Sequence, residues 1–176
     1  MNYKKYYDLE DYLFGEVRKN FQKRGHLLPE EFFCIVIWKR NASKTKIKRG
    51  IEEINKTVQA ITSEIYKSKD REQRLKILIS ISNMGIAIAS AILTVLYPDD
   101  FTVYDYLVLG EINREKRKKM KDFSYSKNAI SEYFNFLNEI KKFAESRNLT
   151  LRDADKELWG KSFYNDLRLL VSHDGK

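Results

Sequence analysis

Apolar residues recur at intervals of three and four along most of the chain, which is the spacing of one face of an α-helix. This pattern predicts helices over residues 9–23, 51–66, 71–81 and 126–147. A further helix should begin at Pro29, because proline suits the first turn of a helix. No stretch alternates persuasively between apolar and polar residues as a half-buried strand does. The sequence therefore predicts an all-α fold.

Two basic segments interrupt the helical pattern. Residues 39–49 are strongly basic and weakly patterned, so we expect them to be mostly loop and a candidate contact for phosphate. Residues 114–121 carry the densest positive charge, and a run of this kind is more often a solvated loop than a phosphate contact. Near the C-terminus, Thr150 and Asp153 resemble a capping box, which predicts the start of a final helix.

The stretch from residue 77 to residue 98 carries no charge and contains a turn signal. Asn83 and Gly85 both tolerate positive φ, so their spacing suits a tight hairpin. The helix that follows should end before Pro98, and Asp105 then stands where a new helix can begin. The stretch is long enough to span a bilayer, but its polar residues and the turn argue against a membrane protein.

Composition adds a domain count and a charge. The chain has 176 residues, only seven glycines and two prolines, and no linker-like segment, so we expect one domain over residues 1–176. Its formal net charge of +8 favours phosphate-rich partners, although a lysine-rich surface can also be merely solvating. Cys34 is the only cysteine, which excludes an intramolecular disulfide and, with no apolar N-terminal segment, favours a cytoplasmic location. We expect no metal and no cofactor.

The hairpin stretch resembles a known family. Asn83-Met84-Gly85 stands where the helix-hairpin-helix DNA glycosylases carry Gly-hydrophobic-Gly, and residues 89–93 look like the helix that follows in that family. Asp105 then falls on the position of the family's catalytic aspartate. Over most of its length the chain is similar to an uncharacterised bacterial and archaeal subgroup related to this superfamily. The resemblance implies a glycosylase-like helical domain, with the hairpin and the aspartate within about residues 71–113.

The resemblance also implies a partner and a set of contacts. A hairpin that turns backbone N–H groups outward at the start of a helix can hold a phosphate of double-stranded DNA without sequence preference. An enzyme that acts on a base must extrude it, and aromatic side chains then stack on it. The implied DNA-binding residues are Ser82, Asn83, Met84, Gly85, Ile86 and Ala87, and the candidate walls of a base pocket are Trp38, Tyr104 and Tyr106.

The implied reaction is hydrolysis of the N-glycosidic bond of a damaged or modified base. Its transition state resembles a sugar cation, which the carboxylate of Asp105 would stabilise. At the position where the lyase-type members carry their lysine, this chain has Ala87, so we expect a monofunctional enzyme without β-lyase activity. Lys76 is the one nearby lysine that could substitute, which we consider improbable. The related subgroup often has arginine two residues after the aspartate, where this chain has Leu107, and this departure weakens the expectation of activity.

Simpler interpretations stand beside these. Asp105 can be an ordinary helix cap, because aspartate is preferred there. Asn83 and Gly85 can form an ordinary turn between helices, and the three aromatic residues are individually more often core or surface residues. The same scaffold can therefore be a non-catalytic nucleic-acid-binding module, or a helical protein-interaction domain without affinity for nucleic acid.

Overall fold

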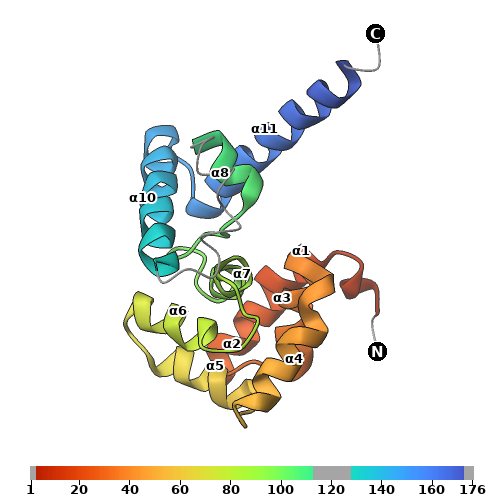
Figure 1. Cartoon of the computed structure of the whole chain (residues 1–176), viewed down its shortest axis with the longest axis vertical. Helices are drawn as coiled ribbons and strands as arrows, with labels where there is room; N and C mark the ends of the chain where they lie inside the picture. The colour runs from red at the N-terminus through yellow and green to blue at the C-terminus, as the bar shows by residue number, and fades with distance from the viewer. Residues whose placement is uncertain (1–2, 113–127, 173–176) are drawn as a thin grey trace. The chain divides into compact units, whose positions relative to one another are not determined.

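The computed structural model describes residues 3–112 and 128–172, and within these residues it contains helices and no strand (Figure 1). The prediction of an all-α fold is confirmed. The chain divides into two compact units, Met1–Phe101 and Thr102–Lys176, and each is described by itself. The expectation of a single domain over residues 1–176 stays a prediction, since two compact units can still fold as one.

Unit 1 begins with a nearly continuous helical run that ends at Gly25. Gly25 has a φ of +76°, and its N–H donates to the carbonyl of Phe21 over 2.8 Å, which closes the run. The helix expected over residues 9–23 is confirmed, except that its middle is a π-helical turn, which the apolar spacing does not indicate. The elements are η1 (Tyr3–Tyr6), α1 (Leu9–Asp11), the π-helix η2 (Tyr12–Val17) and α2 (Arg18–Arg24).

Helix α3 (Pro29–Arg40) begins at the predicted proline and is tied to α2 by one buried carboxylate. Glu31 is 4% exposed and accepts hydrogen bonds from the backbone N–H of Leu28 over 2.8 Å and from Nδ2 of Asn20 over 3.2 Å. The guanidinium of Arg24 pairs with the same carboxylate. Because these contacts come from α2 and from the residue that caps α3, Glu31 fixes the turn between the two helices.

The basic segment 39–49 is helical, which corrects the expectation of a loop. Helix α3 continues to Arg40, η3 covers Asn41–Ser43, and α4 covers Lys44–Glu53. The reason is that Ile47, Gly50 and Ile51 form one buried helical face, while the lysines lie on the exposed face.

The helix expected over residues 51–66 is interrupted, which is a second correction. Asn55 takes a φ of +49°, which ends α4, and the side chain of Thr57 accepts from the N–H of Ala60 to begin α5 (Val58–Lys67). Helices α6 (Arg71–Ile79) and α7 (Ile86–Leu96) follow, and α7 ends before Pro98 as predicted. Every residue of α7 from Ile88 to Leu96 is buried, with α3 and α6 packed against it (Figure 1).

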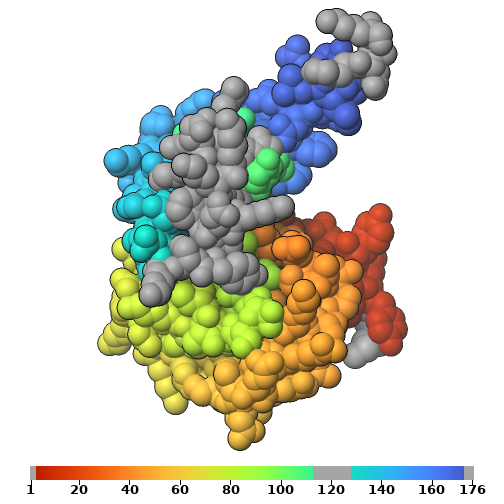
Figure 2. Space-filling view, viewed as in Figure 1, coloured from red at the N-terminus to blue at the C-terminus, as the bar shows by residue number. Residues whose placement is uncertain are grey.

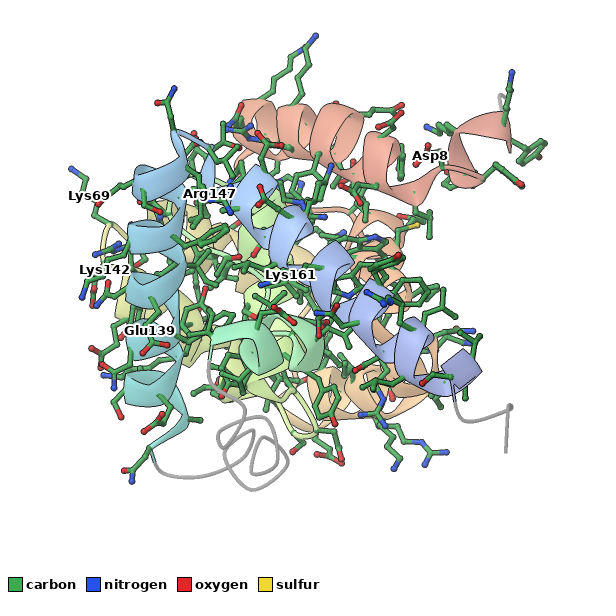
Figure 3. The ribbon with its side chains drawn as sticks, turned by 90° about the horizontal axis from the view of Figure 1, so that it is seen from above. Asp8, Lys69, Glu139, Lys142, Arg147 and Lys161 are labelled. Atoms are coloured by element: carbon green, nitrogen blue, oxygen red, sulfur yellow. The ribbon has the colours of Figure 1, made fainter. Side chains whose placement is uncertain are left out.

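Unit 2 contains α8 (Tyr106–Ile112), α10 (Ala129–Arg147) and α11 (Leu151–Ser172), and α11 packs against both of the others. The N–H of Asp153 donates to Oγ1 of Thr150 over 3.1 Å, which confirms the predicted start of α11. Lys161 pairs with Glu111 on α8, and Arg147 at the end of α10 pairs with Glu157 on α11 (Figure 3). The basic run 114–121 lies outside the described residues.

None of the helices described in residues 3–112 and 128–172 has both the length and the apolar character that a bilayer-spanning helix needs. This finding bears on the uncharged stretch of residues 77–98. The stretch is divided between the end of α6, a turn and the eleven-residue α7.

Candidate nucleic-acid interface

The turn between α6 and α7 is a tight hairpin centred on Asn83. The N–H of Met84 donates to the carbonyl of Ile81 over 3.0 Å, and Asn83 between them has a φ of +66°. Asparagine is one of the few residues other than glycine that adopts this left-handed conformation at low cost. The hairpin predicted from Asn83 therefore forms where expected.

Gly85 has a different role from the one its spacing suggests. Its φ is −77°, so it does not use the freedom that glycine has at positive φ. It is the N-cap of α7, and its carbonyl accepts from the N–H groups of Ile88 and Ala89, each over 3.1 Å. Because glycine has no side chain, the N–H groups of Ile86 and Ala87 have no side-chain acceptor on the cap residue.

The six predicted DNA-binding residues differ in exposure. Ser82 and Asn83 are exposed and Ala87 is half-buried. Gly85 is buried, and Met84 and Ile86 are 3% and 1% exposed, so the side chains of these last two hold the hairpin in the core of unit 1. A phosphate could therefore reach the polar side chains of Ser82 and Asn83, but not the apolar side chains beside them.

Helix α4 lies directly against this hairpin. A Cβ atom added to Gly50 would be 2.3 Å from the carbonyl oxygen of Ser82 and 3.1 Å from the Ser82 Cβ atom. Only a residue without a side chain permits this approach of two backbones. Figure 2 shows the orange surface of α4 and the yellow-green surface of the hairpin side by side.

The close approach brings basic side chains to the edge of the hairpin. Lys46 is one turn before Gly50 on α4, and Arg49 is on the same flank of the helix. Both side chains are exposed, and neither makes an ion pair with any residue in the described part of the chain. Lys48, by contrast, is 3.9 Å from Glu52, and Glu53 also lies on the flank of Lys46. The edge is thus basic, with one acidic neighbour.

Lys46 and Arg49 belong to the segment 39–49, which the sequence pattern predicts to be a loop, and Gly50 follows it directly. The signal that identifies α4 is the spacing of three isoleucines, Ile47, Ile51 and Ile54, which fits one helical face. No local signal indicates that Gly50 meets Ser82, because that contact joins segments far apart in the chain.

Asp105 is the residue immediately before α8, in unit 2. Its Oδ1 atom accepts a hydrogen bond from the N–H of Leu107 over 2.9 Å, which is the geometry of an N-cap. The side chain is half-buried. The prediction that a helix begins at Asp105 is confirmed, and a part in catalysis stays a prediction.

The three predicted pocket aromatics have different environments. Trp38 is half-buried on α3 of unit 1, with its ring centroid 5.8 Å from that of Phe14. Tyr104 is 2% exposed in unit 2, its ring packs edge-on against Phe136 at 5.0 Å, and burial raises the pKa of its hydroxyl. Tyr106 is 50% exposed. Tyr104 is therefore a core residue in its own unit, and a shared pocket stays a prediction.

Lys76 is held by a carboxylate on its own helix. Its Nζ atom is 2.6 Å from Oε1 of Glu72, and this hydrogen bond raises the pKa of the amine. A lysine that forms a Schiff base must lose its proton first, so this environment makes Lys76 a poorer nucleophile. Among the described residues, no group of three or more histidine, cysteine and acidic side chains is arranged to hold a metal ion.

Comparisons with protein-family models, with curated proteins and with solved structures found no match for this chain. The chain is therefore not assigned to a family. The resemblance to the helix-hairpin-helix glycosylases remains an interpretation of the hairpin residues and of Asp105.

Proposed function

We propose that unit 1 binds the phosphate backbone of double-stranded DNA through the α6–α7 hairpin and the adjoining basic flank of α4. The observation that carries this proposal is the approach of Gly50 to Ser82, with 2.3 Å between the ideal Cβ position and the carbonyl oxygen. This approach joins two features that bind anions. The first is a helix N-terminus whose N-cap has no side chain, and the second is a pair of exposed cations, Lys46 and Arg49.

The charges of the whole chain are consistent with this role. A formal charge of +8 raises the local concentration of polyanions and speeds their association. Contacts to phosphate carry no sequence information, so the binding should depend strongly on salt and weakly on base sequence.

The test is fluorescence anisotropy of a labelled DNA duplex with the double variant Lys46→Glu/Arg49→Glu. Loss of two phosphate contacts should lower the affinity at least about tenfold and reduce the slope of log K against log salt by about 2. The matched control is Lys67→Glu/Lys69→Glu, which makes the same charge change at the α5–α6 turn, on the opposite side of unit 1 from α4 (Figure 1). Equal losses in the two variants would mean that only net charge matters and would contradict the proposed surface.

A second candidate function is excision of a base, with Asp105 as the carboxylate that stabilises the sugar cation. It is favoured by the partly exposed side chain of Asp105 and its place at the start of a helix, together with the family resemblance. Ala87 and the protonated Lys76 support a reaction without strand cleavage.

The variant Asp105→Asn separates catalysis from capping. Asparagine caps a helix about as well as aspartate, so the fold and the affinity for DNA should be kept while the negative charge is lost. Duplexes carrying a panel of damaged bases would be incubated with each protein, and abasic sites revealed with alkali. Abasic sites formed equally by wild type and Asp105→Asn would refute the role of Asp105. Strand breaks without alkali would contradict the monofunctional reaction.

A further inference from the structure

The C-terminal half of α11 exposes a row of large apolar side chains. Trp159, Phe163, Leu167 and Leu170 are separated by four, four and three residues, so they share one face of the helix. Tyr164 and Val171 extend this face on one side. We call these six residues the α11 stripe; their exposed fractions are 43% for Trp159, 49% for Phe163, 59% for Tyr164, 44% for Leu167, 66% for Leu170 and 61% for Val171.

The stripe is distinct from the face that α11 buries within unit 2. Leu151, Ala154 and Leu158 are buried where α11 packs against α8 and α10. Beyond that packing the helix continues to Ser172, past the ends of α8 and α10 (Figure 1). Trp159 and Phe163 stack on each other with their rings 7° from parallel and 5.3 Å apart, which leaves their outer faces in solvent.

The area of the stripe is that of a protein interface. The exposed fractions of six large side chains correspond to roughly 600 Å² of apolar surface. Isolated monomers rarely expose a continuous apolar patch larger than a few hundred Å². Two such stripes in contact would bury about 1,200 Å², which reaches the lower end of the range for specific complexes.

Gly160 gives independent evidence for a close approach by another helix. It lies inside the 22-residue α11, where glycine costs about 1 kcal/mol relative to alanine. A Cβ atom at this position would meet no atom within 4 Å, so no contact in the described part of the chain requires glycine. Gly160 is on the stripe, one turn before Phe163 and Tyr164, and its missing side chain leaves a shallow hole there.

The charges of α11 identify the kind of partner. The helix carries four basic and four acidic residues, so it is neutral in a chain whose formal charge is +8. A neutral helix offers little attraction to DNA or to an anionic membrane. Two copies of this helix do not repel each other, whereas copies of a basic surface such as that of α4 would.

We propose that two copies of this chain associate through their α11 stripes as antiparallel helices related by a two-fold axis near Asn165. This arrangement places Trp159 against Val171, Gly160 against Leu170 and Phe163 against Leu167 of the second copy. In two of these pairs a large side chain meets a smaller one, and Leu170 enters the hole at Gly160. In a parallel arrangement, Trp159 would instead face Trp159 of the second copy. The proposal does not depend on DNA binding, since it uses residues of unit 2 alone.

The first test is sedimentation velocity of the full chain over a wide range of concentration. Wild type should change from monomer to dimer, a twofold change in mass, and Phe163→Glu and Leu170→Glu should stay monomeric with unchanged helical circular dichroism. The control is Tyr7→Glu, which alters a 96% exposed aromatic residue in unit 1 and should still dimerise. Wild type that is monomeric at every concentration overturns the proposal. If that monomer binds phosphatidylcholine vesicles, the stripe covers a neutral membrane surface instead, and the proposal is overturned all the same. A dimer that persists in both glutamate variants also overturns it.

Two further variants test the geometry. Gly160→Leu should strengthen the isolated helix and yet weaken the dimer, because the new side chain fills the hole; an unchanged dimer would contradict the packing. In a Cys34→Ser background, Phe163→Cys mixed with Leu167→Cys should give a disulfide-linked heterodimer more readily than either variant alone. Preferential cross-linking of each variant to itself would indicate parallel helices and refute the antiparallel arrangement.

Discussion

Two buried tyrosine hydroxyls differ in what they contact. The hydroxyl of Tyr133 accepts from the N–H of Thr102 over 3.2 Å and donates to the carbonyl of the same residue over 2.9 Å. It therefore ties the start of unit 2 to α10. The hydroxyl of Tyr97 is also buried, but it has no hydrogen-bond partner among the described residues, and its ring packs under the guanidinium of Arg74 at 3.8 Å.

This difference predicts different changes in stability for the same substitution at the two positions. Tyr133→Phe leaves the backbone N–H and carbonyl of Thr102 buried without that partner, so it should lower the free energy of unfolding by about 1–3 kcal/mol. Tyr97→Phe removes a buried hydroxyl but keeps the ring, so it should be neutral or stabilising. Urea unfolding of both variants measures this, and a loss for Tyr97→Phe as large as that for Tyr133→Phe would contradict it.

At the scale of elements, the sequence predicts those helix ends that are marked by a residue beside them. Gly25, Pro98 and Asp105 each act through their own backbone or cap, and the helices end or begin beside them as expected. The break at Asn55 has only a weak signal, because asparagine adopts positive φ readily but the apolar spacing of Ile51, Ile54 and Val58 continues across it as in one helix. The first two turns of α4 have only a weak local signal, because Ile47 is surrounded by Lys44, Lys46, Lys48 and Arg49; Ile51 and Ile54 belong to the helix predicted over residues 51–66.

The candidate site could be predicted only in part, for the same reason. The hairpin follows from Asn83, a local choice of residue, and it lies where expected. The basic flank lies beside the hairpin because Gly50 contacts Ser82. No local pattern in the sequence predicts this contact, since the two residues lie far apart in the chain. At Gly85 a local signal is misleading. Glycine suits a left-handed turn, but this glycine is an N-cap with a φ of −77°.

The packing of α4 on the hairpin gives a sharp prediction for Gly50→Ala. Alanine favours a helix by about 1 kcal/mol over glycine, but its Cβ would be 2.3 Å from the carbonyl oxygen of Ser82. The backbones must separate, so we expect a net loss of about 1–3 kcal/mol in the free energy of unfolding. Gly15→Ala is the matched control, because a Cβ there meets nothing within 4 Å. Thermal unfolding should show Gly50→Ala destabilised and Gly15→Ala not, and equal effects would contradict the close contact.

At the scale of the whole molecule, several buried or half-buried groups share one direction of pKa shift. Burial raises the pKa of the Cys34 thiol above its ordinary 9.0, with nearby Glu31 adding to the effect. Burial also raises the pKa values of Tyr97 and Tyr104 above 10.0. In each case the folded protein keeps a proton that the unfolded chain loses more readily.

The expected result is a loss of stability in alkali. Above the ordinary values of 9.0 for cysteine and 10.0 for tyrosine the unfolded chain binds fewer protons than the folded protein, so the free energy of unfolding falls as pH rises. Below about pH 8 these groups are protonated in both states and give no slope. Urea midpoints measured from neutral pH to about pH 10.5 test this. Tyr97→Phe should reduce the slope, and a stability that rises across this range would contradict the prediction.

The contact between Gly50 and Ser82 also has a consequence for the history of this sequence. A change at position 50 to any larger residue would have to be accompanied by a shift in the turn that follows α6, so the two segments should vary together among descendants of one ancestor. A small residue in an amphipathic basic helix, paired with a left-handed asparagine in a later turn, is a combination by which distant relatives could be recognised.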